Sequence, residues 1–156
     1  METDLTELLV KHRFFANLKH NDVSKLAACG ALLECEPATL LAAEGTNADR
    51  FYALIQGRVA IETNVPGRPP ITLQTVESGD IIGWSWIDAQ DWVFDVRTLT
   101  DCTFVALHAD KLVKVLSSNT ELGFEIMRRL NRVATQRLHA ARLQLLDIYG
   151  KGTRGE

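Results

Sequence analysis

Residues 44–62 read EGTNADRFYALIQGRVAIE, and they carry the strongest indication of the fold. Two runs rich in aliphatic, aromatic and β-branched residues, RFYALI and RVAIE, stand on either side of Gln56-Gly57. Such runs favour strands, and a two-residue connection that contains glycine is typical of a tight hairpin turn. We therefore predict a β-hairpin here, with Gly45 and Gly57 at turns that need a positive φ angle or a close backbone approach.

Similar apolar runs surround this segment between Ala31 and Leu107, and turn-forming residues separate them. The longest break is the loop from Asn64 to Pro70, which holds three prolines and one glycine. Short strands that recur about every 8–12 residues are typical of an antiparallel sandwich or barrel. The expected strands are ALLECEP, TLLAAEG, RFYALIQG, RVAIET, ITLQTV, IIGWSWI, VFDVRTLT and CTFVALH. The fold class is therefore mainly β.

Helical patterns flank the strands. Apolar residues at helical spacing predict short helices over residues 1–29 and a short helix that begins near Asp110. Asn119 is expected to cap a much longer helix. Its apolar positions recur every three or four residues and are Met127, Leu130, Ala134, Leu138, Ala141, Leu145 and Ile148. We expect them to form the seam of a parallel homodimer. The alternative is that the helix folds back over its own strands.

These patterns divide the chain into three parts. Residues 1–107 hold the N-terminal helices and the strands, 108–149 hold the C-terminal helices, and 150–156 are expected to be a disordered tail.

Composition excludes several classes of protein. The chain has 156 residues, of which 46% are hydrophobic and 24% are charged, as in a single globular domain. A net charge of −3 disfavours direct nucleic-acid binding, and from these residues we expect neither a secretory signal nor a membrane span. Three cysteines without a CxxC pair indicate reduced thiols in the cytoplasm rather than a metal site.

Three motifs, together with the order of elements, resemble the sensor domain of the Crp/Fnr family. The motifs are EGTNADRFYALIQGRVAIE, VESGDIIGW and DVRTLTDCTFVALHADKLVKVL, and the resemblance runs from about Phe14 to Tyr149. It implies the cyclic-nucleotide-binding fold, a double-stranded β-helix or jelly roll with a long C-terminal helix. It also implies a stand-alone member of the family, without the helix-turn-helix domain.

The resemblance also implies where a ligand would bind. In nucleotide-binding members, a short helix after a glycine presents amides to the phosphate, a glutamate accepts the ribose hydroxyl, and an Arg-Ser or Arg-Thr pair neutralises the phosphate. Here Trp84 stands in the place of the glutamate, and no arginine lies among residues 92–95. The candidate pocket residues are Gly79, Gly83, Trp84, Ser85, Trp86, Trp92 and Arg97.

Two alternatives remain open within this pocket. Arg97 either points into the roll as a phosphate partner or pairs with Asp95, Asp101 or solvent. The tryptophans either fill the interior or line an apolar ligand site. No cofactor is indicated with certainty, and the candidate occupant is a cyclic nucleotide or another small ligand. We expect cyclic AMP and cyclic GMP to bind weakly or not at all.

We therefore expect a regulatory or sensory module that signals through dimerisation or through a regulatory partner protein. One alternative is a regulator-like protein that does bind cyclic AMP or cyclic GMP. A cupin-like enzyme is disfavoured because His12, His20, His108 and His139 are scattered, and we expect no catalytic activity and no metal site. The arginines of the long helix are expected to form a solvated outer face; they are Arg128, Arg129, Arg132, Arg137 and Arg142.

Overall fold

The structure is a computed structural model that describes residues 4–153, with side chains described through residue 148. Three short helical segments come first: α1 (Leu5–Lys11), the 3-10 helix η1 (Arg13–Phe15) and α2 (His20–Ala27). The strands follow as β1 (Gly30–Cys35), β2 (Leu40–Ala42), β3 (Arg50–Gln56), β4 (Arg58–Thr63), β5 (Ile71–Glu77), β6 (Ile81–Ile82), β7 (Asp95–Thr98) and β8 (Cys102–His108). A second 3-10 helix, η2 (Ser85–Asp88), separates β6 from β7, and α3 (Ala109–Ser118) and α4 (Thr120–Thr153) complete the described chain.

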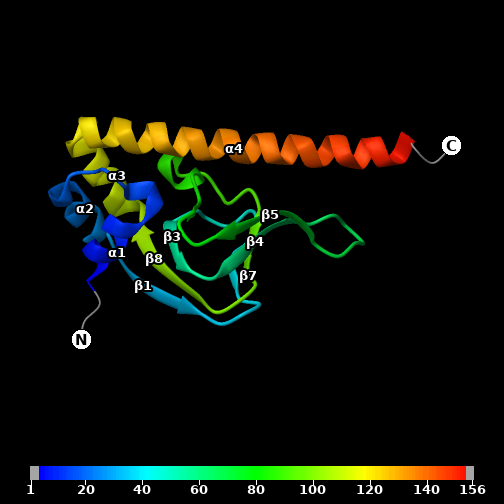
Figure 1. Ribbon diagram of the computed structural model, residues 1–156, viewed down its shortest axis with the longest axis horizontal. Helices are drawn as coiled ribbons and strands as arrows, with labels where there is room; N and C mark the ends of the chain where they lie inside the picture. Colours follow the sequence, from blue (N-terminus) through cyan, green and yellow to red (C-terminus); the bar gives the residue numbers. More distant parts are fainter. Residues whose placement is uncertain (1–3, 154–156) are drawn as a thin grey trace.

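The eight strands form two antiparallel four-stranded sheets. One sheet has the order β1-β8-β3-β6 and the other has the order β2-β7-β4-β5. The two sheets make up a jelly roll, with the helices grouped at one end and along one side (Figure 1). The mainly β class, the flanking helices and the exposed loop from Asn64 to Pro70 are confirmed.

The expected hairpin at Gln56-Gly57 is wrong. β3 pairs with β6 and β8, whereas β4 pairs with β5 and β7, so the two strands lie in different sheets. Gly57, with a φ of +111°, is the corner at which the chain crosses between them. A Cβ atom there would lie 2.5 Å from the backbone oxygen of Asp101, so glycine is needed for space as well as for φ.

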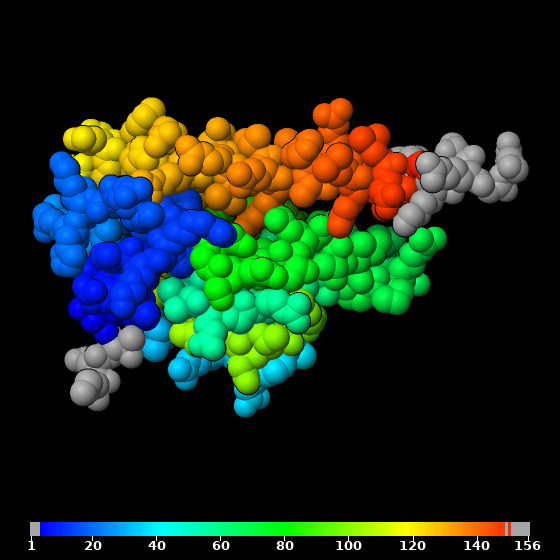
Figure 2. All heavy atoms as spheres, viewed as in Figure 1, coloured from blue at the N-terminus to red at the C-terminus, as the bar shows by residue number. Residues whose placement is uncertain are grey.

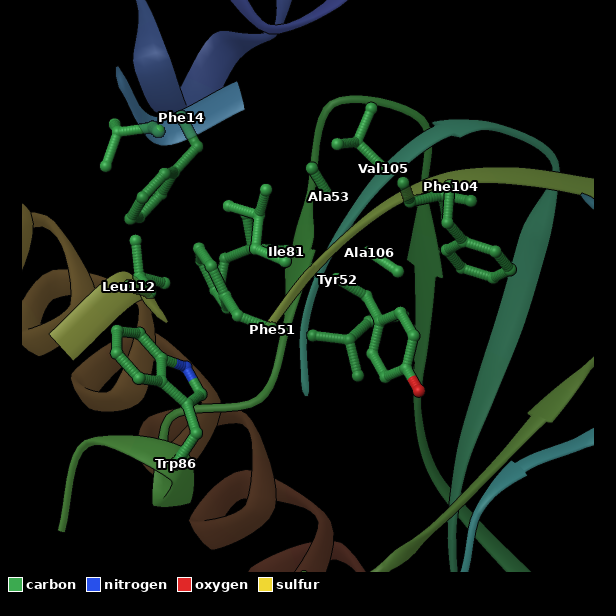
Figure 3. Close-up of a cluster of buried hydrophobic side chains, with 14 of the residues drawn as sticks. Phe14, Phe51, Tyr52, Ala53, Ile81, Trp86, Phe104, Val105, Ala106 and Leu112 are labelled. Atoms are coloured by element: carbon green, nitrogen blue, oxygen red, sulfur yellow. The ribbon is translucent and has the colours of Figure 1, made fainter. Parts of the chain in front are cut away.

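Aromatic side chains join the helical end of the molecule to the roll. Phe14 packs edge-on against Phe51 of β3, with 5.6 Å between ring centroids, and Trp86 of η2 lies 5.1 Å from the same Phe51 ring. Figure 3 shows these rings next to Leu112 of α3 and Ile81 of β6. This core therefore ties the N-terminal helices, α3 and the first turns of α4 to the strands.

The long helix α4 spans 34 residues, about 51 Å at 1.5 Å per residue. Asn119 caps it as expected, because its Oδ1 accepts the Leu122 amide at 3.2 Å. Leu122, Ile126 and Leu130 bury its first turns against α3 and the roll, and Figure 1 shows the helix continuing along one side of the molecule.

The sequence predicts a disordered tail from residue 150, but α4 extends to Thr153; residues 154–156 lie outside the described residues. Within the described part of the chain, no helix combines the length and apolarity of a membrane span.

Candidate functional site

The turn between β5 and β6 and the short helix η2 form the wall where the resemblance places a ligand. Gly79 and Gly83 take positive φ angles, +92° and +100°. A Cβ atom on Gly83 would lie 2.9 Å from Cη2 of Trp92, so this glycine admits the indole ring. Gly79 faces away from that ring, since its nearest neighbour is Arg13 of η1.

Trp86 and Trp92 fill the interior. Trp86 is almost fully buried, and its Nε1 donates to the backbone oxygen of Gly83 at 3.2 Å. Trp92 is also buried and stacks on Tyr52, with 6.2 Å between ring centroids. For these two residues the structure therefore agrees with the core alternative. The backbone oxygen of Ser85, the first residue of η2, accepts the Gln90 amide at 3.0 Å and so closes the segment locally.

Trp84, unlike Trp86 and Trp92, lines a small apolar cavity that we call the roll cavity. The roll cavity has a volume of about 180 Å³ and lies between the roll and α4. Trp84 and Phe94 form one wall, with their rings edge to face at 5.5 Å. Ala134, Leu138 and Ala141 of α4 form the opposite wall.

Arg137 of α4 enters this region, which corrects the expectation of a solvated arginine face. Arg137 is only 9% exposed, and its guanidinium carbon lies 5.4 Å from the centre of the Trp84 ring. Nη2 donates to the backbone oxygen of Ile81, whereas Nη1 is buried without a hydrogen-bond partner among the described residues. Burial lowers the pKa of Arg137 to about 10, partly offset by Asp80.

The sequence contains a signal for this burial. Arg137 continues the three- and four-residue steps of Ile126, Leu130 and Val133, which all face the core. Arg129 is also withdrawn from solvent, because its Nη1 donates to the backbone oxygen of Phe14 at 2.6 Å.

Arg97 does not line the roll cavity. Its neighbour Val96 is fully buried, and Arg97 lies on the opposite face of β7, where its Nε donates to Oε1 of Glu62 at 3.1 Å. Its pairing partner is thus neither Asp95 nor Asp101. The Asp95 carboxylate instead accepts the amide of Glu44 at 2.8 Å and the side-chain amide of Asn64 at 2.7 Å.

The apolar face of α4 also differs from the expected seam at one position. Leu130 is only 3% exposed because it packs in the core of its own chain. The other six expected residues fit one heptad pattern together with Phe124 and Asn131, two residues outside the expected seam. We call this set the α4 seam: Phe124, Met127, Asn131, Ala134, Leu138, Ala141, Leu145 and Ile148. Phe124 and Leu138 are 71% and 72% exposed.

Neither metal ligands nor disulfides contribute to this region. Among residues 4–153, no three His, Cys, Asp or Glu side chains lie close enough together to hold a metal ion. Cys29, Cys35 and Cys102 are free thiols, and burial raises the pKa of Cys29 and of Cys35.

Solved structures of similar fold come from bacteria and from a parasite. A cyclic nucleotide-binding domain from Methylobacillus flagellatus KT has a TM-score of 0.77 and 23% identity, over 92% of this chain and 81% of that one. The sensor domain of the transcriptional regulator DNR from Pseudomonas aeruginosa has a TM-score of 0.70 and 20% identity, over 86% and 91%. The regulatory domain of Toxoplasma gondii PKA, solved with cAMP, has a TM-score of 0.71 and 17% identity, over 85% and 49%.

These structural similarities show the fold, and the sequence profile shows the family. No curated protein matches the chain by sequence. The profile described as "Cyclic nucleotide-binding domain" matches residues 32–119, which is more than half of the chain and spans β-roll, η2 and α3. The chain therefore belongs to the cyclic nucleotide-binding domain family.

Proposed function

We propose that this protein is a regulatory sensor module that acts as a homodimer paired along the α4 seam. One observation carries the proposal: Ala134, Leu138 and Ala141 belong to the seam and also line the roll cavity. A change in the occupancy of the roll cavity would therefore act on the same side chains that contact the second helix. A regulatory protein partner that reads the dimer is part of the proposal.

The heptad pattern supports a parallel pair of helices. Apolar residues at alternating steps of three and four residues form the seam of two-stranded coiled coils, and one polar Asn at a core position selects register and strand number. Asn131 occupies such a position between Phe124 and Leu138. Four large apolar residues of the seam are exposed, and pairing of two helices would remove them from water; they are Phe124, Leu138, Leu145 and Ile148.

We also propose that the roll has lost the phosphate site of the family. Small-molecule sites usually have volumes of about 300–1,000 Å³, whereas the roll cavity has only about 180 Å³. Trp84 stands in place of the expected glutamate, and Arg97 pairs with Glu62 outside the cavity. These features support weak binding or none for cyclic AMP and cyclic GMP.

Other features support a regulatory role, a cytoplasmic location and the absence of direct DNA binding. Two of the three similar structures named above are the sensor domain of a transcriptional regulator and the regulatory domain of PKA, which supports a regulatory rather than a catalytic role. Three free thiols support a cytoplasmic location, and the net charge of −3 supports the absence of direct DNA binding.

Two measurements test the proposal. Isothermal titration at millimolar cyclic AMP or cyclic GMP should give no saturable heat, and micromolar binding of either would overturn the loss of the phosphate site.

Sedimentation equilibrium at tens of micromolar protein should give a dimer, and Leu138→Glu should give a monomer. The matched control is His139→Glu, which places the same charge on an exposed neighbouring residue off the seam. A wild-type monomer would overturn the dimer.

A further inference from the structure

A second and larger cavity adjoins the roll cavity, and Gln74 and Arg137 line both of them. It has a volume of about 640 Å³ and is bounded by η1, the turn between β5 and β6, and the middle of α4. Figure 2 shows the N-terminal segment in blue, the middle of the chain in green and α4 in orange meeting on one face of the molecule. We call it the arginine cavity.

The arginine cavity is strongly basic in an acidic protein. Arg13, Arg128, Arg129, Arg132 and Arg137 line it, and Asp80 is its single carboxylate. Five guanidinium groups around one space repel each other, and this repulsion is not matched by acidic residues in the lining. The arrangement is stabilised when an anion enters.

Not all of these arginines are free. Arg13 is paired with Asp80, and Arg128 and Arg129 both bind Glu125, which lies outside the lining. Their hydrogen bonds lower the pKa of Glu125 to about 2, so that its carboxylate remains ionised. Even with this carboxylate included, cationic groups outnumber anionic ones in and around the cavity.

Two arginines lack an anionic partner. Arg132 makes no hydrogen bond or ion pair with any of the residues that the structure describes. Arg137 is more than nine-tenths buried, and its Nη1 has no hydrogen-bond partner among the described residues. A buried, incompletely paired cation is costly, and an anionic ligand next to it would reduce that cost.

We propose that the arginine cavity binds a small phosphorylated molecule through its phosphoryl groups. Guanidinium groups bind phosphate oxygens in bidentate fashion, and several of them around one space select a ligand with more than one negative charge. The volume lies in the range of small-molecule sites and exceeds what a single inorganic phosphate needs.

The arginine cavity is separate from the α4 seam. Arg129 and Gln136 lie at heptad positions on the face of α4 opposite the seam, so pairing of two helices leaves the cavity open. A ligand there would contact both η1, through Arg13, and α4, through Arg132. The proposal that a ligand binds in the arginine cavity does not depend on the proposed function. The further step, that the ligand shifts the position of α4, does rest on it.

Titration with inorganic pyrophosphate at low ionic strength tests the proposal. Wild-type protein should bind it saturably, and Arg132→Gln should weaken binding about tenfold or more, as expected for loss of a charge-assisted contact. The matched control is Arg142→Gln, which removes an exposed arginine of the same helix outside the cavity and should leave the affinity unchanged. Because Arg132 is exposed and makes no hydrogen bond or ion pair within the described chain, its variant should melt at the wild-type temperature.

Three results would overturn the proposal. The first is no saturable binding at millimolar pyrophosphate. The second is equal weakening by Arg132→Gln and Arg142→Gln, which would indicate attraction to the helix as a whole. The third is a short DNA duplex that competes at lower concentration than pyrophosphate, because the site would then be a nucleic-acid surface. The seam variant Leu138→Glu should bind pyrophosphate as the wild type does, so this test stands even if the dimer fails.

Discussion

His12 is a buried residue between α1 and η1 whose ring is held in one neutral form. Its Nδ1 accepts the Phe14 amide at 3.1 Å, and its Nε2 lies 3.2 Å and 3.1 Å from the backbone oxygens of Leu54 and Asp80. A neutral ring with the proton on Nε2 satisfies all three groups. Burial lowers the pKa of His12 below 6.5, although both backbone oxygens oppose the shift.

This environment predicts that acid destabilises the fold. The unfolded chain binds a proton at His12 near pH 6.5, and the folded chain does so only at lower pH. The free energy of unfolding should therefore fall as the pH drops below 6.5, with a slope from this residue of at most about 1.4 kcal/mol per pH unit.

Urea midpoints between about pH 5 and pH 8 would measure this dependence. His12→Gln should lose part of the slope, even if the variant is less stable throughout. The exposed His139→Gln should keep the wild-type slope. Equal slopes in the wild type and in His12→Gln would show that His12 does not titrate with folding.

At the scale of elements, the contact of α3 with α4 depends on Gly123. This glycine lies in the first turns of α4, and a Cβ atom there would lie 2.6 Å from the backbone oxygen of Leu116 in α3. Replacing a helix-interior glycine with alanine usually stabilises a helix by about 1 kcal/mol. Here the steric conflict with a backbone atom opposes that gain, since backbone cannot move aside as a flexible side chain can.

We predict that Gly123→Ala lowers the free energy of unfolding by about 1–3 kcal/mol, as overpacking does elsewhere. Gly150 provides the control because it lies in the same helix and a Cβ atom there meets nothing within 4 Å. Gly150→Ala should leave stability unchanged or raise it. Chemical denaturation of both variants decides, and a stabilised Gly123→Ala would mean that α3 and α4 approach less closely than the structure has them.

At the scale of the whole molecule, dimerisation should make stability depend on protein concentration. Only the folded chain presents the α4 seam, so association favours folding by mass action. We predict that the melting temperature of the wild type rises between micromolar and hundreds of micromolar protein, as measured by calorimetry. Leu138→Glu should melt at a temperature independent of concentration, while His139→Glu should follow the wild type. A concentration-independent wild type would contradict pairing along α4.

Much of the fold is readable along the chain. Local patterns predict strands in eight places, the exposed loop from Asn64 to Pro70, a positive φ at Gly45 and the cap at Asn119, and the structure has each of them. The expected strand IIGWSWI is wrong beyond Ile82, because Ser85–Asp88 form the 3-10 helix η2. These features depend on local properties: the β preference of short apolar runs, the φ angles open to glycine, and a side chain that binds an amide three residues on. The family resemblance rests on the same local motifs.

Three features were settled only by packing between distant parts of the chain. The tight corner at Gly57 is visible in the sequence, but strands of opposite sheets meet there because β3 and β4 find other partners. Arg97 has the charge for a phosphate site, yet the register of β7 turns it toward Glu62. Arg137 looks like a solvent residue until α4 lies on the roll and covers it. The sequence by itself determined the elements and their turns, because those depend on neighbouring residues. Only the tertiary structure decided which face of each strand and helix is covered, because that depends on what packs against it.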